Sequence, residues 1–330
     1  MSSAGQHEPY GWGGALVFPI FRSLVEFKAF TLFSFLFGVG VAIQAGRVSS
    51  QQRIGFLARR FGALLAIGLI HILFIWNGDI LTLYAICGLV VIPLLRLRDY
   101  ALFVFGLALI IWPNIAPFPV VFPATATLKS LTAGALHAYG KGTWHQLFAF
   151  RLLETRLLIL PLLMLSLPRT LGLMLWGIGA WRKGWMENNP RLWRWAAILG
   201  TTVGIAGHWL RVGEAESIGV ALVYAAVLLL WNPRAPSIAA AGRMALTNYL
   251  TESVIFGFIF YSYGLGWFGR IGVVATLLGG VVVYGLQLVF SQCQCRKQLC
   301  ASTARCGRLS GSQPESTIHK ADLACDVALR

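Results

Sequence analysis

Long apolar runs separated by short polar breaks make up most of the chain between residues 27 and 290. The runs are about 15 to 25 residues long, close to the length of a helix that crosses a bilayer. The pattern predicts an all-α fold, a polytopic transmembrane helical bundle. We expect about nine spans, at 27–45, 57–76, 80–95, 100–122, 157–181, 195–211, 217–231, 245–266 and 271–290.

The tightest polar break follows His71 and contains only Asn77, Gly78 and Asp79. One apolar run enters this break and another leaves it. We interpret the segment as two transmembrane helices joined by a short turn, with His71 inside the first helix and Asp79 just before the start of the second. Ionisable residues within membrane segments are costly to bury and often mark functional sites.

The stretch from residue 123 to residue 181 permits two interpretations. Its middle part, 143–156, mixes charged residues with aromatic residues and leucines, which is typical of an amphipathic interfacial helix. Residues 157–181 then form one span. Alternatively, 147–167 and 169–181 are two spans, which raises the total to ten. The basic residues that follow favour the single span, because it leaves them on the cytoplasmic side.

The composition agrees with a membrane protein. Of the 330 residues, 57% are hydrophobic and 12% are charged, and the mean hydropathy is +0.70. Soluble domains carry about a quarter charged residues. A formal charge of +15 on a soluble chain would indicate nucleic acid. Here the basic residues lie in short loops between apolar runs, so we expect contact with the lipid bilayer and no nucleic-acid partner.

The same basic loops predict the orientation of the spans. The loop 46–60 is expected in the cytoplasm, which places Asn77, Gly78 and Asp79 outside and the C-terminus inside. The N-terminus then lies outside, although we expect no removable signal peptide there. One more helix before residue 1 would resolve this conflict. The expected regions are an outer N-terminal segment (1–26), a transmembrane domain (27–290) and an aberrant, disordered cytoplasmic tail (291–330).

Five of the six cysteines lie in this tail. Their spacing does not match the paired C-x-x-C pattern of zinc sites, so no metal site and no disulfide framework are predicted. No phosphate-binding glycine loop and no nucleophilic serine elbow are present either.

Four blocks in order along the chain carry a family resemblance: EFKAFTLFSFLFGVGVAIQ at 26–44, H-x4-WNGDIL at 71–81, LPRTLGLMLWGIGAWRKGW at 167–185, and GRMALTNYL at 242–250 followed by YSYG at 261–264. They resemble the YeiB-like family of bacterial inner-membrane proteins, a domain of unknown function. The resemblance covers about residues 20–290 and implies a multi-pass protein of the inner membrane.

Two departures from this family pattern stand out. Family members begin with a helix that carries a Leu-Asp-x-x-Arg-Gly-like motif, and nothing like it precedes residue 27. Their usual aromatic ending is replaced here, after Gln292, by a cysteine-rich sequence without periodicity. We hypothesise a late start at Met1 and a frameshift near residue 292, which the flanking DNA would test.

The resemblance also implies a distant similarity to membrane acyltransferases, which move acyl groups from a cytoplasmic donor to an envelope acceptor. The leading hypothesis is therefore an acyltransferase-like protein that acts on an envelope or lipid-linked acceptor, with an acyl donor such as acyl-CoA. His71 would be a base oriented by Asp79, the arrangement usual in acyl transfer. The structural alternative is a histidine hydrogen-bonded between helices and an Asp79 that caps the next helix.

Further polar residues are candidates for substrate binding. Glu26, Lys28 and Asn77 could line an outer mouth beside Asp79, although Glu26 and Lys28 equally fit an ordinary interface pair. A buried Arg169 would need an acidic or carbonyl partner, and Glu252 is one choice.

A transporter is the rival hypothesis. Asn248 and Glu252 are four residues apart and therefore share a helix face, where they could form a polar site in the middle of the membrane. Arg243 would lie at the inner gate, or could receive an anionic donor in an acyltransferase. A structural membrane protein or an inactive gene product is the third alternative.

Overall fold

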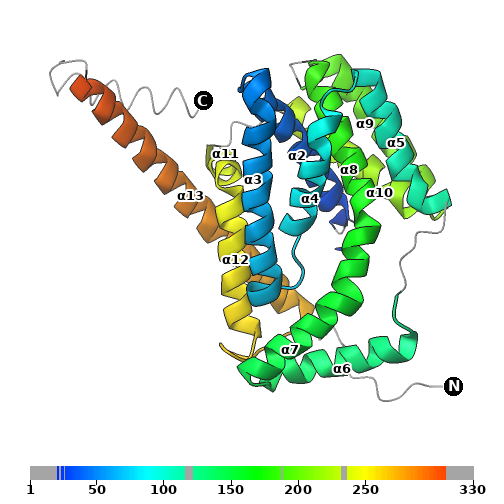
Figure 1. The fold of residues 1–330 in the computed structure, drawn as a ribbon, viewed down its shortest axis with the longest axis vertical. Helices are drawn as coiled ribbons and strands as arrows, with labels where there is room; N and C mark the ends of the chain where they lie inside the picture. Colours follow the sequence, from blue (N-terminus) through cyan, green and yellow to red (C-terminus); the bar gives the residue numbers. More distant parts are fainter. Residues whose placement is uncertain are drawn as a thin grey trace. The chain divides into compact units, whose positions relative to one another are not determined.

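A computed structural model describes residues 21, 24–25, 27–115, 122–186, 189–231 and 236–309, and this part of the chain is helical without a strand. Figure 1 labels the elements. They are α2 (Lys28–Gly46), α3 (Ser50–Ile70), the π-helix η1 (His71–Ile75), α4 (Leu81–Leu94), α5 (Asp99–Ile115), α6 (Thr125–Lys141), α7 (Trp144–Glu154), the π-helix η2 (Thr155–Ile159), α8 (Leu160–Arg182), α9 (Pro190–Trp209), α10 (Gly213–Trp231), α11 (Pro236–Arg243), α12 (Ala245–Phe260) and α13 (Val273–Leu309).

The all-α class predicted from the sequence is confirmed, and each of the nine expected spans contains a helix. Five segments within the described residues are long and apolar enough to cross a membrane: Lys28–Gly46, Ser50–Ile75, Trp144–Arg182, Gly213–Trp231 and Val273–Cys295. Shorter apolar helices cover Leu81–Leu94, Asp99–Pro113 and Ala245–Phe260. The number of nine spans stays a prediction.

The chain divides into two compact units. One contains residues 16–231 and 257–270, and we call it the main unit. The other contains residues 1–15, 232–256 and 271–330, and we call it the C-terminal unit. Each unit is described by itself below.

Helix α8 is the central element of the main unit. It packs against α2, α4 and α5, and Met174, Leu175 and Ile178 lie fully buried in the core that these helices share. Glycines permit the closest approach. A Cβ atom on Gly38 of α2 would collide with the carbonyl oxygen of Met174, and one on Gly177 would collide with that of Phe35. Small residues at such crossings are a common way for membrane helices to associate.

The helix from Trp144 to Arg182 is uninterrupted, since α7 continues through η2 into α8. Pro168 lies inside α8, so the two-span interpretation of 147–181 is wrong. The predicted helix at 143–156 is confirmed as α7, which begins with a capping box made by Thr143 and Gln146. In Figure 1, α6 runs across the lower end of the main unit, and the chain turns through α7 into the rising helix α8.

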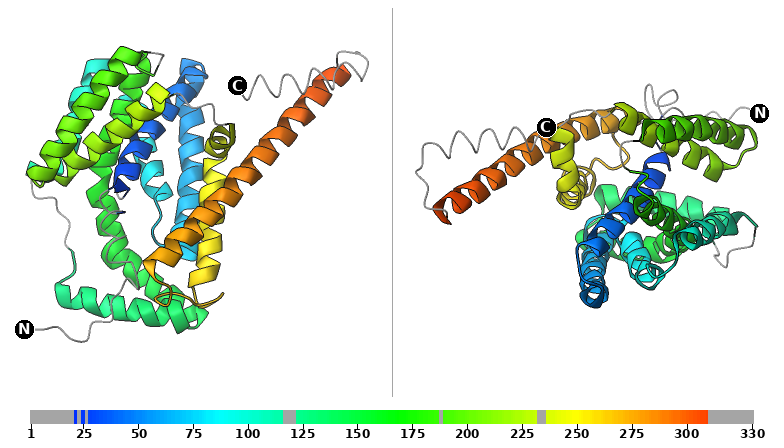
Figure 2. Two further views of the ribbon diagram at one scale, coloured as in Figure 1. Left: turned by 180° about the vertical axis from the view of Figure 1, so that it is seen from behind. Right: turned by 90° about the horizontal axis from the view of Figure 1, so that it is seen from above.

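Helices α9 and α10 form an antiparallel hairpin in the main unit (Figure 2). Glycines bring the two backbones together. A Cβ atom on Gly200 would meet the carbonyl oxygen of Gly219, and one on Gly207 would collide with the backbone of Glu216. Helix α10 also packs against α2.

The C-terminal unit contains α11, the first part of α12, and α13. Asn248 of α12 is buried and donates a hydrogen bond to Ser291 Oγ of α13 at 3.1 Å, while Gln287 Nε2 donates to the carbonyl oxygen of Asn248 at 2.8 Å. Ser237 Oγ donates to Gln292 Oε1 at 2.9 Å, which links α11 to α13.

Two helix ends differ from the predicted ones. Helix α3 begins at Ser50, so most of the expected basic loop 46–60 is helical, with Arg59 and Arg60 exposed on the helix surface. Helix α13 does not stop at residue 290 but continues to Leu309, so 291–309 is helical rather than irregular. This segment has no proline, and extending a formed helix requires no new nucleation. Residues 310–330 of the expected tail lie outside the described residues.

Candidate functional site

The turn after α3 brings His71 and Asp79 into direct contact. His71 opens η1, Trp76 takes an extended conformation, and the chain folds back toward the start of α4. Nδ1 of His71 then lies 3.0 Å from Oδ1 of Asp79, and neither side chain has exposed surface. The fold-back that the sequence required for a shared site is therefore present.

Close packing of α3 on α4 holds this turn shut. A Cβ atom on Gly68 would collide with the backbone nitrogen and the hydroxyl of Thr82. The second carboxylate oxygen of Asp79 accepts a hydrogen bond from the Thr82 backbone N–H at 2.7 Å. Asp79 thus both contacts His71 and satisfies a free N–H in the first turn of α4, so capping of α4 does not exclude the predicted role of Asp79 beside His71, which stays a prediction.

A second polar group surrounds the tip of the turn. Glu154 Oε2 accepts hydrogen bonds from Asn77 Nδ2 and from the Tyr139 hydroxyl, each at 2.5 Å. Tyr139 is buried, and burial together with the hydrogen bond to the Glu154 carboxylate raises the pKa of its hydroxyl above the ordinary value. Asn77 is therefore held by α6 and α7 through Glu154.

Arg151, about one helical turn before Glu154 on α7, fixes the π-helical end of α3. Its guanidinium is fully buried, and Nη1 donates to the carbonyl oxygen of Leu73 at 3.3 Å. The cation also lies 4.8 Å from the ring centre of Tyr261 and 5.9 Å from that of Tyr139, within the range of cation–π attraction. Leu73 follows His71 by two residues, so Arg151 supports the backbone that carries the histidine.

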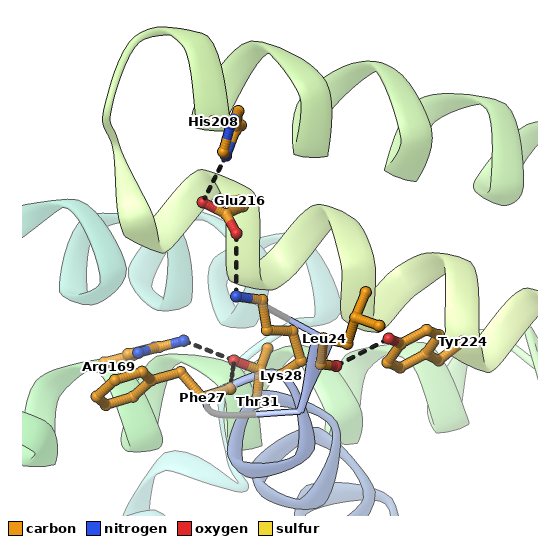
Figure 3. A network of polar contacts seen from close by, with 8 residues as sticks. All are labelled: Leu24, Phe27, Lys28, Thr31, Arg169, His208, Glu216 and Tyr224. Carbon is orange, nitrogen blue, oxygen red and sulfur yellow. Dashed lines mark hydrogen bonds and ion pairs between the residues drawn. The ribbon is translucent and has the colours of Figure 1, made fainter. Parts of the chain in front are cut away.

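A separate network joins α2, α8, α9 and α10 (Figure 3). Lys28 Nζ lies 3.0 Å from Glu216 Oε1, and His208 Nδ1 lies 3.5 Å from Glu216 Oε2. Arg169 Nε lies 2.7 Å from Glu214 Oε2, and its Nη2 donates to Thr31 Oγ1 at 2.6 Å. The Lys28–Glu216 pair brings the start of α2 against the start of α10.

The predicted substrate-binding residues do not form one cluster. Lys28 is paired with Glu216, and this contact does not place Lys28 beside Asp79 as expected. Glu26 lies outside the described residues. Arg169 finds its acidic partner in Glu214 rather than in Glu252.

The other predicted residues lie in the C-terminal unit. The amide of Asn248 is used in contacts within that unit. Glu252 is half-buried, and Arg243 is exposed at the end of α11.

Sequence reasoning missed the residues that enclose the turn. Arg151 and Glu154 stand out only as charges on an amphipathic helix, and Tyr139 carries no motif at all. The turn from α6 into α7 brings Tyr139, Arg151 and Glu154 together near Asn77 and Leu73. Within the described residues, no group of three or more metal-binding side chains is present.

The chain is similar in sequence to several known proteins. Residues 180–298 match the model of a protein of unknown function, DUF418. The chain is 28% identical over 311 residues to the uncharacterised protein YxaH of Bacillus subtilis, which covers 82% of this chain and 76% of the relative. It is 27% identical to an uncharacterised 39.9 kDa protein of Bacillus acidopullulyticus, over 81% of this chain and 75% of the relative.

A third relative carries the family name. The chain is 24% identical over 278 residues to the uncharacterised protein YeiB of Escherichia coli, which covers 73% of this chain and 70% of that protein. No solved structure is significantly similar. These matches confirm the resemblance predicted from the four sequence blocks, and the chain is related to the YeiB-like family of uncharacterised proteins.

Proposed function

We propose that this protein is a membrane acyltransferase in which His71 is the general base and Asp79 orients it. The observation that carries the proposal is the buried contact of 3.0 Å between His71 Nδ1 and Asp79 Oδ1. A carboxylate on one ring nitrogen favours the tautomer in which the other nitrogen, Nε2, can accept a proton. This is the arrangement that activates a hydroxyl nucleophile.

The proposed reaction transfers an acyl group from a thioester such as acyl-CoA to a hydroxyl of an envelope or lipid-linked acceptor. His71 Nε2 takes the proton of the acceptor hydroxyl while the oxygen attacks the thioester carbonyl. The new C–O bond forms, the C–S bond breaks, and the proton passes from His71 to the thiolate that leaves. No oxidant or metal is needed for this balance. Because the His71 side chain has no exposed surface, the turn at 76–80 has to move when substrates bind.

The surroundings of the turn support this role. Glu154 holds the tip through Asn77, and Arg151 holds the π-helical backbone through Leu73. The backbone that carries His71 is π-helical, a conformation that is rare in proteins. We also propose that the protein is embedded in the bilayer of the bacterial inner membrane, with its C-terminus in the cytoplasm.

The transport hypothesis gains no supporting contact from the described residues, since the Asn248 amide is used in bonds to Ser291 and to the carbonyl of Ala241.

The test uses the full chain reconstituted in vesicles of bacterial envelope lipids, with radiolabelled acetyl-CoA and a longer acyl-CoA as probes. Release of free thiol and transfer of label to the envelope fraction are measured together. His71→Asn keeps a donor near the position of Nδ1 but removes Nε2, so we expect transfer to fall by about 10²- to 10⁴-fold. Asp79→Asn should also reduce transfer, because it removes the charge that orients the ring.

His145→Asn is the matched control, since His145 is an exposed histidine on α7. It should transfer label at the wild-type rate. Wild-type transfer by a folded His71→Asn protein would refute the role of His71. Absence of transfer by the wild type from both donors would refute the acyltransferase proposal itself.

A further inference from the structure

A groove of about 350 Å³ lies between α9 and α10 in the main unit. Helix α9 contributes one face, with residues 200, 201, 204, 205, 208 and 209, and α10 contributes Glu216, Val220 and Val223. The α9 face extends over nine residue steps, which is about 13 Å along the helix axis. The groove is therefore elongated and runs parallel to a helix pair.

The two ends of this groove differ in chemistry. One end is bounded by Gly200 and Val223, and the middle by Gly204, Ile205 and Val220, so most of its length is apolar. The other end carries His208 and Glu216 beside the largely exposed Trp209. Helix α10 is one of the five described segments that are long and apolar enough to cross a membrane, which is compatible with a lipid in the apolar part of the groove.

The turn that closes the polar end contains an unexpected residue. Helix α9 ends in a Schellman motif, in which Val212 N–H donates to the Gly207 carbonyl at 2.8 Å and Arg211 N–H to the His208 carbonyl at 3.2 Å. The residue at the left-handed position is Arg211, with φ 58°. Helix α8 ends in the same motif, and there the position is Gly184, with φ 68°.

Glycine adopts this conformation without steric cost, whereas a residue with a Cβ atom loses about 1 to 2 kcal/mol. An arginine at the left-handed position therefore opposes backbone preference and indicates a role for its charge. The acidic residues at this end are already engaged, Glu214 by Arg169 and Glu216 by Lys28 and His208. Arg211 makes no ion pair with a described residue and is exposed, which leaves this end with an available positive charge.

We propose that the groove binds one acyl chain of a bilayer phospholipid, with the lipid phosphate held at Arg211. The apolar length of the groove accepts the chain, and the exposed Arg211 in the turn beside its polar end complements the phosphate. This site is separate from the His71–Asp79 pair and does not depend on the proposed reaction.

The test measures lipid retained by the full chain after purification in detergent with added dioleoyl phosphatidylglycerol or dioleoyl phosphatidylcholine, by native mass spectrometry. The wild type should retain one tightly bound lipid and prefer the anionic one. Arg211→Gly should lower the preference for phosphatidylglycerol about fivefold, the factor that corresponds to about 1 kcal/mol for one basic residue at a lipid surface. Arg211→Lys should keep the preference.

Filling the groove tests the chain-binding part. Gly204→Leu should reduce retention of both lipids about tenfold, as expected when about two methylene groups lose their contacts. A Cβ atom on Gly204 has ordinary contacts at 3.5 Å, so Gly204→Ala tests folding and should retain lipid. Ile198→Phe, at an exposed position of α9 outside the groove, and Arg270→Gln, at an exposed turn, are the matched controls.

Two results would overturn the proposal. The first is full retention of lipid by a folded Gly204→Leu protein, because the chain would then lie elsewhere. The second is an unchanged lipid preference in Arg211→Gly, or an equal loss in Arg270→Gln, because the phosphate would then not be held by Arg211.

Discussion

Arg169 Nε lies 2.7 Å from Glu214 Oε2, across 45 residues of sequence and between two helices of the main unit. The arginine is almost fully buried, and its side chain also donates to Thr31 and lies 5.8 Å from the ring centre of Phe30. A buried cation without its partner is costly, so this pair stabilises the arrangement in which α8, α10 and α2 meet.

We therefore expect Glu214→Gln to destabilise the protein by about 2 kcal/mol, below the usual range for a fully buried pair because Glu214 is about one-third exposed. Arg169→Met should restore part of this loss in the double variant, since the unpaired charge is gone. Thermal unfolding in detergent provides the four stabilities of the cycle. Lys183→Met serves as the control, because its contact with Asp99 is 3.8 Å long and exposed and should contribute less than about 1 kcal/mol. Strict additivity of the two changes would contradict the coupling.

Two glycines on α2 should respond in opposite directions to the same substitution. Gly38→Ala places a methyl group against the Met174 backbone and should cost about 1 to 3 kcal/mol, because the α2–α8 crossing has to widen. Gly40→Ala has only the flexible Gln44 side chain within 4.0 Å and should gain up to about 1 kcal/mol from helix propensity. Urea or thermal unfolding of the two variants measures the contrast. Equal effects would show that the crossing is not as close as described.

The burial of Tyr139 predicts a loss of stability at alkaline pH. Burial and the Glu154 carboxylate raise the pKa of this phenol, so the folded state keeps its proton to a higher pH than the unfolded state does. Above about pH 10, the unfolded chain binds fewer protons, and stability should fall by up to about 1.4 kcal/mol per pH unit. Tyr139→Phe should flatten the dependence of the melting temperature between pH 9.5 and 11, with Tyr100→Phe, at an exposed position, as the control. A slope that remains unchanged in Tyr139→Phe would assign the effect to other groups.

Arg211 and Gly184 occupy the same position of the same helix-ending motif. Arg211→Gly should therefore raise the free energy of unfolding by about 1 kcal/mol, since glycine takes a positive φ without strain. Gly184→Ala should lower it by a similar amount. Thermal unfolding without added lipid separates this backbone effect from lipid binding. A destabilised Arg211→Gly protein would mean that Arg211 makes structural contacts that outweigh its strained backbone.

Much of the fold follows from the order of residues. Apolar runs of bilayer length have to be helical, because a helix satisfies its own backbone hydrogen bonds within the lipid. The nine expected spans accordingly coincide with helices, and the Asn77–Asp79 break with a turn. Helix ends were less predictable. The basic stretch 50–60 is helical because Arg side chains can extend from a helix end into water, and hydropathy does not distinguish this from a loop.

The contacts of the candidate site depended on tertiary structure. The sequence placed His71 and Asp79 on the two sides of one short turn, and local chain geometry is enough to join them. It could not select Glu214 as the partner of Arg169, nor bring Arg151, Glu154 and Tyr139 around the turn. Those choices depend on how α2, α8 and α10 cross and on the bend from α7 into α8. Such crossings are decided by close packing at glycines such as Gly38 and Gly177, which a pattern of hydrophobic and polar positions does not record.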